Sequence, residues 1–416
     1  MPEAVHQPGS PRLPLSNIRV LDLSRIMAAP WATQILADLG ADVIKIERPG
    51  TGDDTRSWGP PFLKSADGHP LSDAGYFLAV NRGKRSVTID ISTPEGQSIV
   101  RELAKTADVV VENFKAGALV RYGLDAASLR ALKPSIVYCS VTGFGQNGPR
   151  RDQAAYDFAI QAMGGLMSIT GEHPDRPGGG PQKVGIPIVD LMTGMYAAVA
   201  ILAALTRRAE NGEGETIDIA MLDVTAAMLS NQAMNYLLGG KSPTQSGNRH
   251  PNIQPQDVFQ SANAPFVLAV GNDGQFRKLC AVVGHPDWAE DDRFSTNAAR
   301  VDHSAELTAL LREAFAKFDR TVLCDALDAA GVPAAPINTI AQLFEDPQIL
   351  ARGLLCQIPH PVAGSVPTVA SPIRLKESPL RFDLAPPMLG AHTDEIMAEL
   401  NLEPAAPAKS AMENEA

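Results

Sequence analysis

Cysteine and aromatic residues are scarce in this chain of 416 residues. The four cysteines, Cys139, Cys280, Cys324 and Cys356, lie far apart and form no C-x-x-C pair, which argues against a zinc cluster and a disulfide framework. No histidines or carboxylates have metal-ligand spacing either. Aromatic residues make up 5% of the chain, hydrophobic residues 44% and charged residues 20%, as in ordinary globular proteins. We therefore expect a globular protein of a reducing compartment without a metal site.

Long apolar runs and clusters of positive charge are also missing. The longest apolar run, MYAAVAILAAL (195–205), is too short to cross a bilayer, and the N-terminus lacks the basic patch and apolar core of a signal peptide. The formal net charge is -11 and no run of Lys or Arg forms a basic stripe, so nucleic acid or an anionic membrane is not the expected partner. These features predict a cytoplasmic protein that holds any anionic ligand by local positive charge.

Short apolar segments alternate with helical patterns up to about residue 150. IRVLDL (18–23) and ADVIKIE (41–47) have the composition of strands, and APWATQILADLG (29–40) between them has helical periodicity. The pattern repeats, with further strands expected at 86–91, 107–113 and 134–141 and further helices at 94–106, 118–124 and 126–133. Such alternation predicts an α/β fold with a parallel sheet, in a doubly wound, Rossmann-like large domain.

A chain of this length exceeds what one hydrophobic core usually supports, so we expect a second, smaller domain. The nearly all-apolar segment 191–210 predicts a buried helix, and the polar, turn-rich stretch 239–256 predicts the crossing into the second domain. The predicted parts are a large domain at 16–241, a small α/β domain at 242–331, a C-terminal return to the large domain at 332–402, and loose ends at 1–15 and 403–416.

The first strand, helix and strand invite a dinucleotide-binding interpretation, because Glu47 ends the second strand where an acidic residue often meets a ribose hydroxyl. However, the segment SRIMAAP after the first strand lacks the glycines of G-x-G-x-x-G. That pattern does occur at GFGQNG (143–148), but Pro149 follows it instead of an apolar helix, which favours a turn. A nicotinamide enzyme is therefore disfavoured.

Three cations flank the carboxyl ends of the expected strands, where ligands of open parallel sheets collect. Arg48 follows the second strand, whereas Lys115 and Arg121 follow the strand at 107–113. Together they could bind a phosphorylated ligand. Any one of them alone could equally be a solvated surface charge.

Asp190 lies between an extended apolar stretch and the long helix expected at 191–210. Asp is a favoured N-cap, and a helix N-terminus would also stabilise the ionised carboxylate that a nucleophile needs. With a reference pKa of about 3.9, Asp190 would be ionised at neutral pH. Capping and nucleophilic attack therefore both remain open for Asp190. His250 and His392 stand in distinctive loops, where a lone histidine is more often structural.

Ordered motifs extend from about Ile18 to Leu402. They are VLDLSRIMAAPWATQILADLGADVIKIERPGTGDDTRSWGPPF, VNRGKRSVTIDI, ADVVVENFKAG, CSVTGFGQNGP, YDFAIQAMGGLM, VGIPIVDLMTGMYAAVAILAAL, GNRHPNIQP, AVGNDGQF, RFSTNAARV, AGVPAAPIN and PPMLGAHT. Together these motifs resemble the family III CoA-transferases. The resemblance implies a CoA thioester as co-substrate without a permanently bound cofactor, and two subunits wound through each other as an interlocked homodimer.

The same resemblance implies roles for individual residues. D-x-x-T-G, from Asp190 to Gly194, matches the nucleophilic aspartate of the family, and backbone amides near Met27 are candidates for stabilising charge on the attacked carbonyl. The CoA contacts of the family fall on Ile26, Met27, Arg48, Ile89, Asp90, Asn113, Phe114, Lys115 and Arg121.

The motifs GDDTRSWGPPF, VNRGKRS and AVGNDGQF are most similar to the branch that uses succinyl-CoA as donor and a small dicarboxylic acid as acceptor. Arg25, Tyr156, Arg249 and His250 are the residues expected to contact these acids. A racemase is the alternative within the family. Its His-Asp pair is matched here by Tyr156-Asp157, and a phenol with a pKa of about 10 is poorly tuned to abstract the proton next to a thioester. A non-catalytic acyl-CoA-binding protein is the second alternative.

Overall fold

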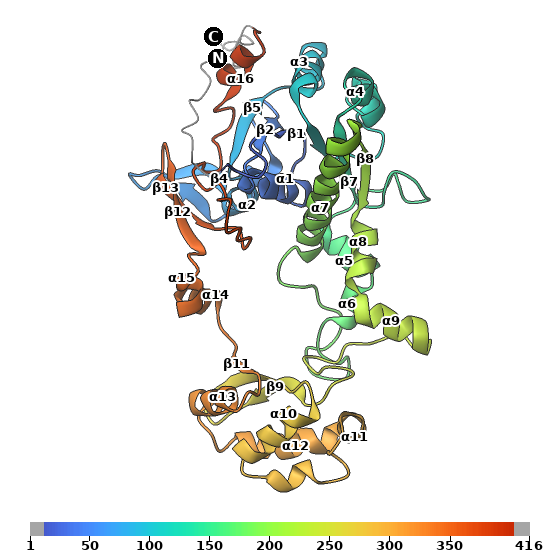
Figure 1. Ribbon diagram of the computed structural model, residues 1–416, viewed down its shortest axis with the longest axis vertical. Coiled ribbons are helices and arrows are strands. Elements are labelled where there is room, and N and C mark those ends of the chain that lie inside the picture. Colours follow the sequence, from blue (N-terminus) through green and yellow to red (C-terminus); the bar gives the residue numbers. More distant parts are fainter. Residues whose placement is uncertain (1–11, 403–416) are drawn as a thin grey trace, which may run out of the picture. The chain divides into compact units, whose positions relative to one another are not determined.

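The computed structural model describes residues 12–402, which form two compact units. The first unit contains residues up to Gly164, Gly185–Ser230 and the chain from Arg352, and the second contains Gly165–Val184 and Asn231–Ala351. Figure 1 labels their helices and strands where there is room.

Parallel strands build the sheet of the first unit. Their order is β5 (Lys84–Thr88), β2 (Asp42–Glu47), β1 (Arg19–Asp22), β6 (Val109–Glu112), β7 (Val137–Thr142) and β8 (Thr216–Ala220). Numbered along the chain, this order is 3-2-1-4-5-6, which is the order of doubly wound dinucleotide-binding folds. The predicted α/β fold with a large parallel sheet is thereby confirmed. The order reverses between β1 and β6, which is where such folds bind ligands.

Helices cover both faces of this sheet, so the strands are apolar on both sides. Side chains of β1 alternate: Val20 belongs to the core beneath α1 (Ala28–Asp38) and α7 (Ile188–Asn211), whereas Leu21 belongs to the core beneath α3 (Pro94–Thr106). The remaining elements of the first unit are η1 (Asp54–Ser57), β3 (Phe62–Lys64), β4 (Pro70–Ala74), α2 (Gly75–Val80), η2 (Val120–Tyr122), α4 (Ala126–Leu132), α5 (Asp157–Met163), α8 (Met221–Met228), β12 (Leu355–His360), β13 (Gly364–Val369) and α16 (Thr393–Glu399).

Helix α7 is only partly buried, although its apolar sequence predicts full burial. Ala197 and Ile201 face the sheet, but Met195, Tyr196 and Val199 are exposed by 41%, 44% and 60%. Within residues 12–402, α7 is the one helix long and apolar enough to span a membrane by length and composition, which the sequence interpretation missed because it counted only 195–205. Its buried face packs on the sheet as in a soluble core helix.

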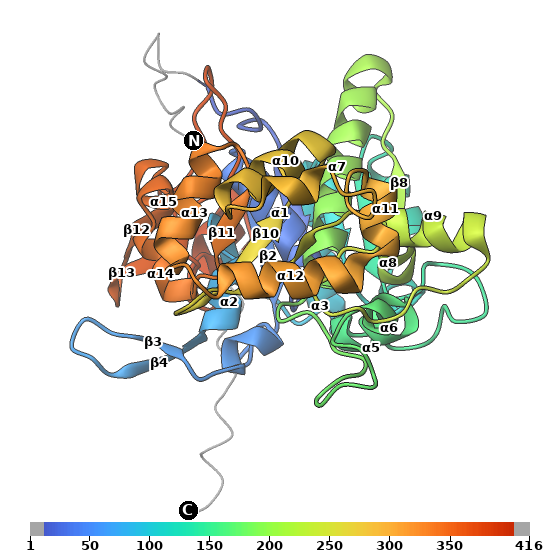
Figure 2. The same ribbon diagram turned by 90° about the horizontal axis from the view of Figure 1, so that it is seen from below.

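The second unit surrounds a small antiparallel sheet in the order β11 (Ala334–Pro336), β10 (Pro265–Ala269), β9 (Gln256–Gln260). Phe259, Phe266 and Phe315 form its centre, with Phe315 edge-on to the other two rings. Figure 2 shows α10, α12 and α13 around these strands. The helices of this unit are α6 (Leu166–Ile169), α9 (Ser230–Gly239), α10 (Asp273–Val282), η3 (Pro286–Ala289), α11 (Asn297–Asp302), α12 (Ser304–Phe315), α13 (Arg320–Ala329), α14 (Ile340–Glu345) and α15 (Pro347–Ala351).

The borders of the two units differ from the predicted borders at 242 and 332. Residues 165–184 join the second unit because backbone and side-chain bonds tie them to its loop: Gly247 donates to the Gly171 carbonyl at 3.0 Å and Gln245 to the Met167 carbonyl at 3.1 Å. Residues 332–351 also stay with the second unit, since β11 pairs with β10 there. These are tertiary contacts, which turn composition does not reveal.

The C-terminal segment from Arg352 onwards lies in the first unit. It lies along β5: the amide of His392 donates to the Ser86 carbonyl at 2.9 Å, and Glu399 pairs with Arg85 at 2.6 Å. At the other end, residues 12–15 are not loose, because Leu15 donates to the Leu39 carbonyl at 2.9 Å and packs on the core. The other predicted loose residues, 1–11 and 403–416, lie outside the described residues.

Candidate functional site

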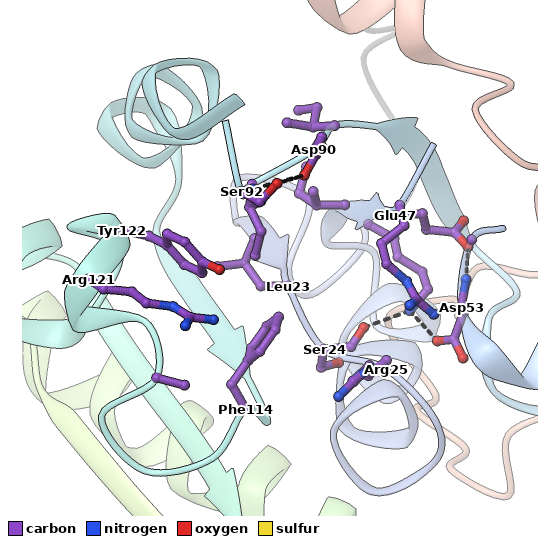
Figure 3. Close-up of a pocket in the computed structure, with 17 residues that line it drawn as sticks. Leu23, Ser24, Arg25, Glu47, Asp53, Asp90, Ser92, Phe114, Arg121 and Tyr122 are labelled. Atoms are coloured by element: carbon purple, nitrogen blue, oxygen red, sulfur yellow. Dashed lines mark hydrogen bonds and ion pairs between the residues drawn. The ribbon is translucent and has the colours of Figure 1, made fainter. Parts of the chain in front are cut away.

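A pocket of about 320 Å³ opens at the carboxyl ends of the strands that flank the reversal of strand order (Figure 3). Four segments meet there: the loop after β1, the end of β2 with the loop that follows, the stretch after β5, and the loop after β6. The lining residues are Leu23, Ser24, Arg25, Lys45, Ile46, Glu47, Arg48, Gly52, Asp53, Ile89, Asp90, Ile91, Ser92, Phe114, Ala118, Arg121 and Tyr122.

Most residues predicted to bind the cofactor lie in this lining. Arg48, Ile89, Asp90, Phe114 and Arg121 are among them, and so is Arg25, which was expected to contact the acids. In Figure 3 the side chain of Arg121 extends towards Phe114.

The other predicted cofactor residues are not part of the lining, namely Ile26, Met27, Asn113 and Lys115. Asn113 supports it from behind, because its side chain accepts from the Arg25 amide at 3.0 Å and donates to the Arg25 carbonyl at 2.7 Å. Lys115 is exposed on the surface beside the loop.

Two arginines that line the pocket, Arg25 and Arg48, form ion pairs with the same acid. Asp54 accepts from Arg48 at 2.6 Å and from Arg25 at 3.3 Å, so the two guanidinium groups share one carboxylate. The Arg25 guanidinium also lies 5.6 Å from the centre of the Phe114 ring. Guanidinium groups suit phosphate and carboxylate ligands because their planar donors match those oxygens.

Glu47 does not serve as a ribose acceptor, because its carboxylate is already occupied. It accepts from Arg56 through both oxygens, at 2.8 and 2.7 Å, and from the Ser86 hydroxyl at 2.7 Å. It is 3% exposed. This arrangement agrees with the earlier rejection of a nicotinamide site, and the GFGQNG stretch forms a turn in which the Gly145 amide donates to the Thr142 hydroxyl.

Asp190 stands in the first turn of α7, which begins at Ile188 after Pro187. The N-cap interpretation is therefore wrong. A different acid caps the helix: the carboxylate of Asp157 accepts from the amides of Val189 and Asp190 at 2.7 and 3.2 Å. Sequence reasoning missed this role of Asp157 because the contact joins residues far apart in the chain.

The protonation of Asp190 also differs from the expectation of a carboxylate ionised well below neutrality. Burial, and next the repulsion from Asp157, raise the pKa of Asp190 to about 7. The attraction of the helix N-terminus is therefore outweighed at this position. Around neutral pH, the group is present in both its protonated and its ionised form.

Helices α1 and α7 approach each other at Gly194. A Cβ atom at this position would lie 2.5 Å from the carbonyl oxygen of Ala28 and 2.9 Å from the Trp31 ring, so only glycine permits the contact. Gly194 is one helical turn beyond Asp190, which is about 6 Å along the axis. The N-terminus of α1, with Met27 as its N-cap, therefore lies close to Asp190. Its first amides have no partner within the helix and can donate to a ligand.

The other residues expected to contact the acids are not among the residues that line this pocket. Tyr156 precedes α5 and is 61% exposed. Arg249 and His250 belong to the second unit. There the Nδ1 atom of His250 accepts from the amides of Asn252 and Ile253, both at 3.1 Å, and so shapes its own loop.

Glu112 is a further acid that the sequence interpretation did not select. It ends β6, accepts from the Phe114 amide at 2.7 Å and is bonded to the Ser140 hydroxyl. Burial raises the pKa of Glu112 to about 7. Its place at the end of an apolar strand, next to a pocket loop, is the signal that could have identified it.

Known proteins resemble this chain over almost its full length. A family model described as CoA-transferase family III matches residues 15–393. A "Succinate--glutarate CoA-transferase" of Agrobacterium fabrum is 51% identical over 387 residues, covering 93% of this chain and 96% of that protein. A "Succinyl-CoA:glutarate CoA-transferase" of Mus musculus is 39% identical over 387 residues, which cover 93% of this chain and 86% of that protein. The crystal structure of a CAIB/BAIF family protein from Brucella suis has a TM-score of 0.82 at 50% identity, covering 93% and 99%.

Proposed function

The chain belongs to CoA-transferase family III, and we propose that it moves CoA from succinyl-CoA to a small dicarboxylic acid such as glutarate. Two relatives are named for succinate or succinyl-CoA together with glutarate. The family membership inferred from the ordered motifs is confirmed by the family model. The observation that carries the proposed mechanism is the position of Asp190 in a poorly solvated first turn of α7, one turn before the close approach of Gly194 to the first turn of α1.

The transfer begins when a carboxylate oxygen of Asp190 attacks the acyl carbon of the donor thioester. The carbon–sulfur bond breaks, which yields an aspartyl anhydride and CoA thiolate. The thiolate then attacks the aspartyl carbonyl carbon, so that the donor acid leaves as a carboxylate and an aspartyl thioester remains. The acceptor acid repeats these steps in reverse order and restores the Asp190 carboxylate. Each intermediate stays activated, so the reaction needs no ATP.

Two features of the site support this chemistry. A carboxylate that is poorly hydrated is more basic than usual, and the raised pKa of Asp190 indicates that state. The first amides of α1, at Met27 and Ala28, are the donors proposed for the oxygen of the attacked carbonyl. One preorganised donor of this kind contributes about 3 kcal/mol elsewhere.

The CoA moiety is proposed to occupy the pocket at the strand ends. Arg48 and Arg121 would bind its phosphates, while Ile89, Asp90 and Phe114 would line the nucleotide. Of the remaining predicted contacts, Ile26 and Asn113 would act through the backbone segment that they shape, and Lys115 would add surface charge.

The acid-binding residues remain predictions of the same proposal. Arg25 is favoured for the second carboxylate of the acceptor, because it lines the pocket and its guanidinium is exposed. Tyr156, Arg249 and His250 are retained as further contacts on the basis of the family resemblance alone.

The proposal includes an interlocked homodimer that works in the cytoplasm. Exposed apolar side chains on α7 and α9 support an additional protein interface, among them Met195, Val199, Leu237 and Leu238. The cytoplasmic assignment rests on the scattered cysteines of the sequence. Light scattering on the purified protein should give twice the mass of one chain, and a monomer would contradict the dimer.

A racemase remains the less favoured alternative. It would need a general base beside Asp190 that is tuned near neutral pH. Tyr156 is a phenol on the surface, and the Asp157 carboxylate is engaged by the amides that begin α7. Exchange of the hydrogen next to the thioester in deuterated water, without any acid present, would favour the racemase.

The function is tested by incubating the enzyme with succinyl-CoA and a panel of mono- and dicarboxylic acids, and identifying new thioesters by mass spectrometry. We expect dicarboxylic acids such as glutarate to give products, with succinate released. Products from monocarboxylic acids alone would reject the dicarboxylate assignment. The Asp190→Asn variant serves as the matched control, since it keeps the shape of the side chain but lacks the nucleophilic oxygen pair.

A further inference from the structure

The connection between β1 and α1 contains a strained residue. Ile26 has a φ of 74°, in the left-handed region that β-branched side chains rarely adopt. Such a backbone persists only where its surroundings over-determine it. Met27 follows directly and is the N-cap of α1, so the direction of the first amides of α1 depends on how Ile26 is held.

A buried ion pair forms hydrogen bonds to the backbone of this connection at two residues. Both carboxylate oxygens of Asp53 lie 3.2 Å from the amide nitrogen of Ile26. The ammonium group of Lys45 donates to the Ser24 carbonyl at 2.8 Å. Lys45 and Asp53 are themselves 2.9 Å apart, with both side chains 0% exposed. The pair therefore fixes the segment on either side of Arg25.

Both oxygens of the Asp53 carboxylate are occupied by hydrogen-bond donors. Besides the Ile26 amide and Lys45, it accepts from the amide and the hydroxyl of Thr55, at 3.0 and 2.8 Å. Burial alone would raise the pKa of Asp53, but the attraction of Lys45 and these hydrogen bonds lower it to about 2. All of its neighbours are donors, so an amide group in its place would set an N–H against one of them.

We propose that Asp53 and Lys45 are positioning residues for CoA transfer: their ion pair keeps Ile26 left-handed and so holds the first amides of α1 beside Asp190. The inference rests on the function proposed above. The link to Asp190 is the close contact of Ala28 with Gly194, one turn beyond the nucleophile. An error of about 1 Å in the placement of such donors lowers turnover by about 100-fold elsewhere.

The test compares Asp53→Asn with the matched control Asp73→Asn. Asp73 is also buried and also loses an ion pair, with Arg56 at 2.6 Å, but it makes no contact with residues 24–26. We expect Asp53→Asn to lower kcat by about 100-fold while the KM for succinyl-CoA changes by less than about threefold. Asp73→Asn should leave kcat within about threefold of the wild type.

Replacing Ile26 by glycine distinguishes a positioning role of Asp53 from a role in stability alone. If Asp53 acts by positioning, the glycine should restore part of the kcat that Asp53→Asn removes. Glycine adopts the left-handed region without steric cost, so the backbone at position 26 no longer depends on the Lys45–Asp53 ion pair. In an Ile26→Gly background, we expect Asp53→Asn to lower kcat by less than about tenfold. An equal loss in both backgrounds, or a loss that only follows thermal stability, would overturn the proposal.

A crystal structure of Asp53→Asn gives a readout that does not depend on activity. We expect the φ of Ile26 to become negative, and an unchanged left-handed Ile26 would overturn the proposal. If the wild type transfers no CoA, the proposed function fails and this φ alone decides the inference. If Asp53→Asn does not fold, the double variant Lys45→Gln with Asp53→Asn removes both charges of the pair and carries the same expectations.

Discussion

Two aspartates of the first unit differ in their neighbours and therefore in their protonation. Asp53 lies against Lys45, and this attraction overcomes burial and lowers its pKa to about 2. Within residues 12–402, no cation is among the groups that shift the pKa of Asp190. Burial and then the repulsion from Asp157 raise its pKa to about 7. A cationic partner thus produces a structural anion, whereas an acidic neighbour produces a carboxyl group that titrates near neutrality, as reactive groups often do.

The strongest way to break this contrast is to remove the reactive acid. Asp190→Asn should lower the rate of CoA transfer by about 10⁴-fold or more, because it deletes the nucleophile. Binding of a non-hydrolysable succinyl-CoA analogue, measured by calorimetry, should stay within about threefold, since the pocket is formed by other residues. Turnover within tenfold of the wild type would contradict the assignment of Asp190.

The structural acid should matter for stability. Lys45→Met leaves the Asp53 carboxylate buried without its partner, which should lower the free energy of unfolding by about 3–5 kcal/mol in urea titrations. Lys105→Met is the control, because Lys105 pairs with Glu102 on the surface and should contribute at most about 1 kcal/mol. Equal effects of the two substitutions would show that burial does not distinguish the pairs.

The cations at the pocket are expected to act on binding more than on chemistry. Arg48→Gln and Arg121→Gln should each raise the KM for succinyl-CoA by about tenfold, while kcat falls less, because a charge-assisted bond to phosphate is lost. Steady-state kinetics provide the measurement. Arg312→Gln, on the surface of the second unit, is the control that should change neither constant. If the KM for succinyl-CoA of both pocket variants equals that of the wild type, CoA binds elsewhere.

The smallest expected effect is a shift in the pH dependence of kcat/KM, which tests the raised pKa of Asp190 directly. Because Asp190 attacks as the ionised form and its pKa is about 7, kcat/KM should rise about tenfold per unit below pH 7 and level off above it. Asp157→Asn removes the neighbouring charge and should move this midpoint to lower pH, though not to the usual Asp value, since burial remains. A profile that is flat between pH 5 and pH 8 would contradict the raised pKa of Asp190.

Much of the fold could be predicted from the sequence, because apolar segments of strand and helix length alternate along it. The place of Asp190 at the start of a long helix and the cations at the strand ends were also predictable. The cap supplied by Asp157 was not, since it depends on a contact between residues 33 positions apart. The pKa of Asp190 was not either, since it depends first on burial in the folded chain and then on that contact. Lys45 lies within the apolar strand at 41–47, and nothing in that local pattern indicates a buried ion pair. Its burial is compensated by Asp53, which arrives from the following loop, and by the nearby carboxylates of Asp22 and Glu47.

The most direct test of the account is to trap the covalent intermediate. Wild-type enzyme would be mixed with succinyl-CoA without an acceptor, quenched in acid, digested and mapped by mass spectrometry. The account predicts a peptide in which Asp190 carries CoA as a thioester, and the loss of that peptide after treatment with hydroxylamine. Modification of Asp157 or another carboxylate instead, or rapid transfer without any modified aspartate, would contradict the central role of Asp190.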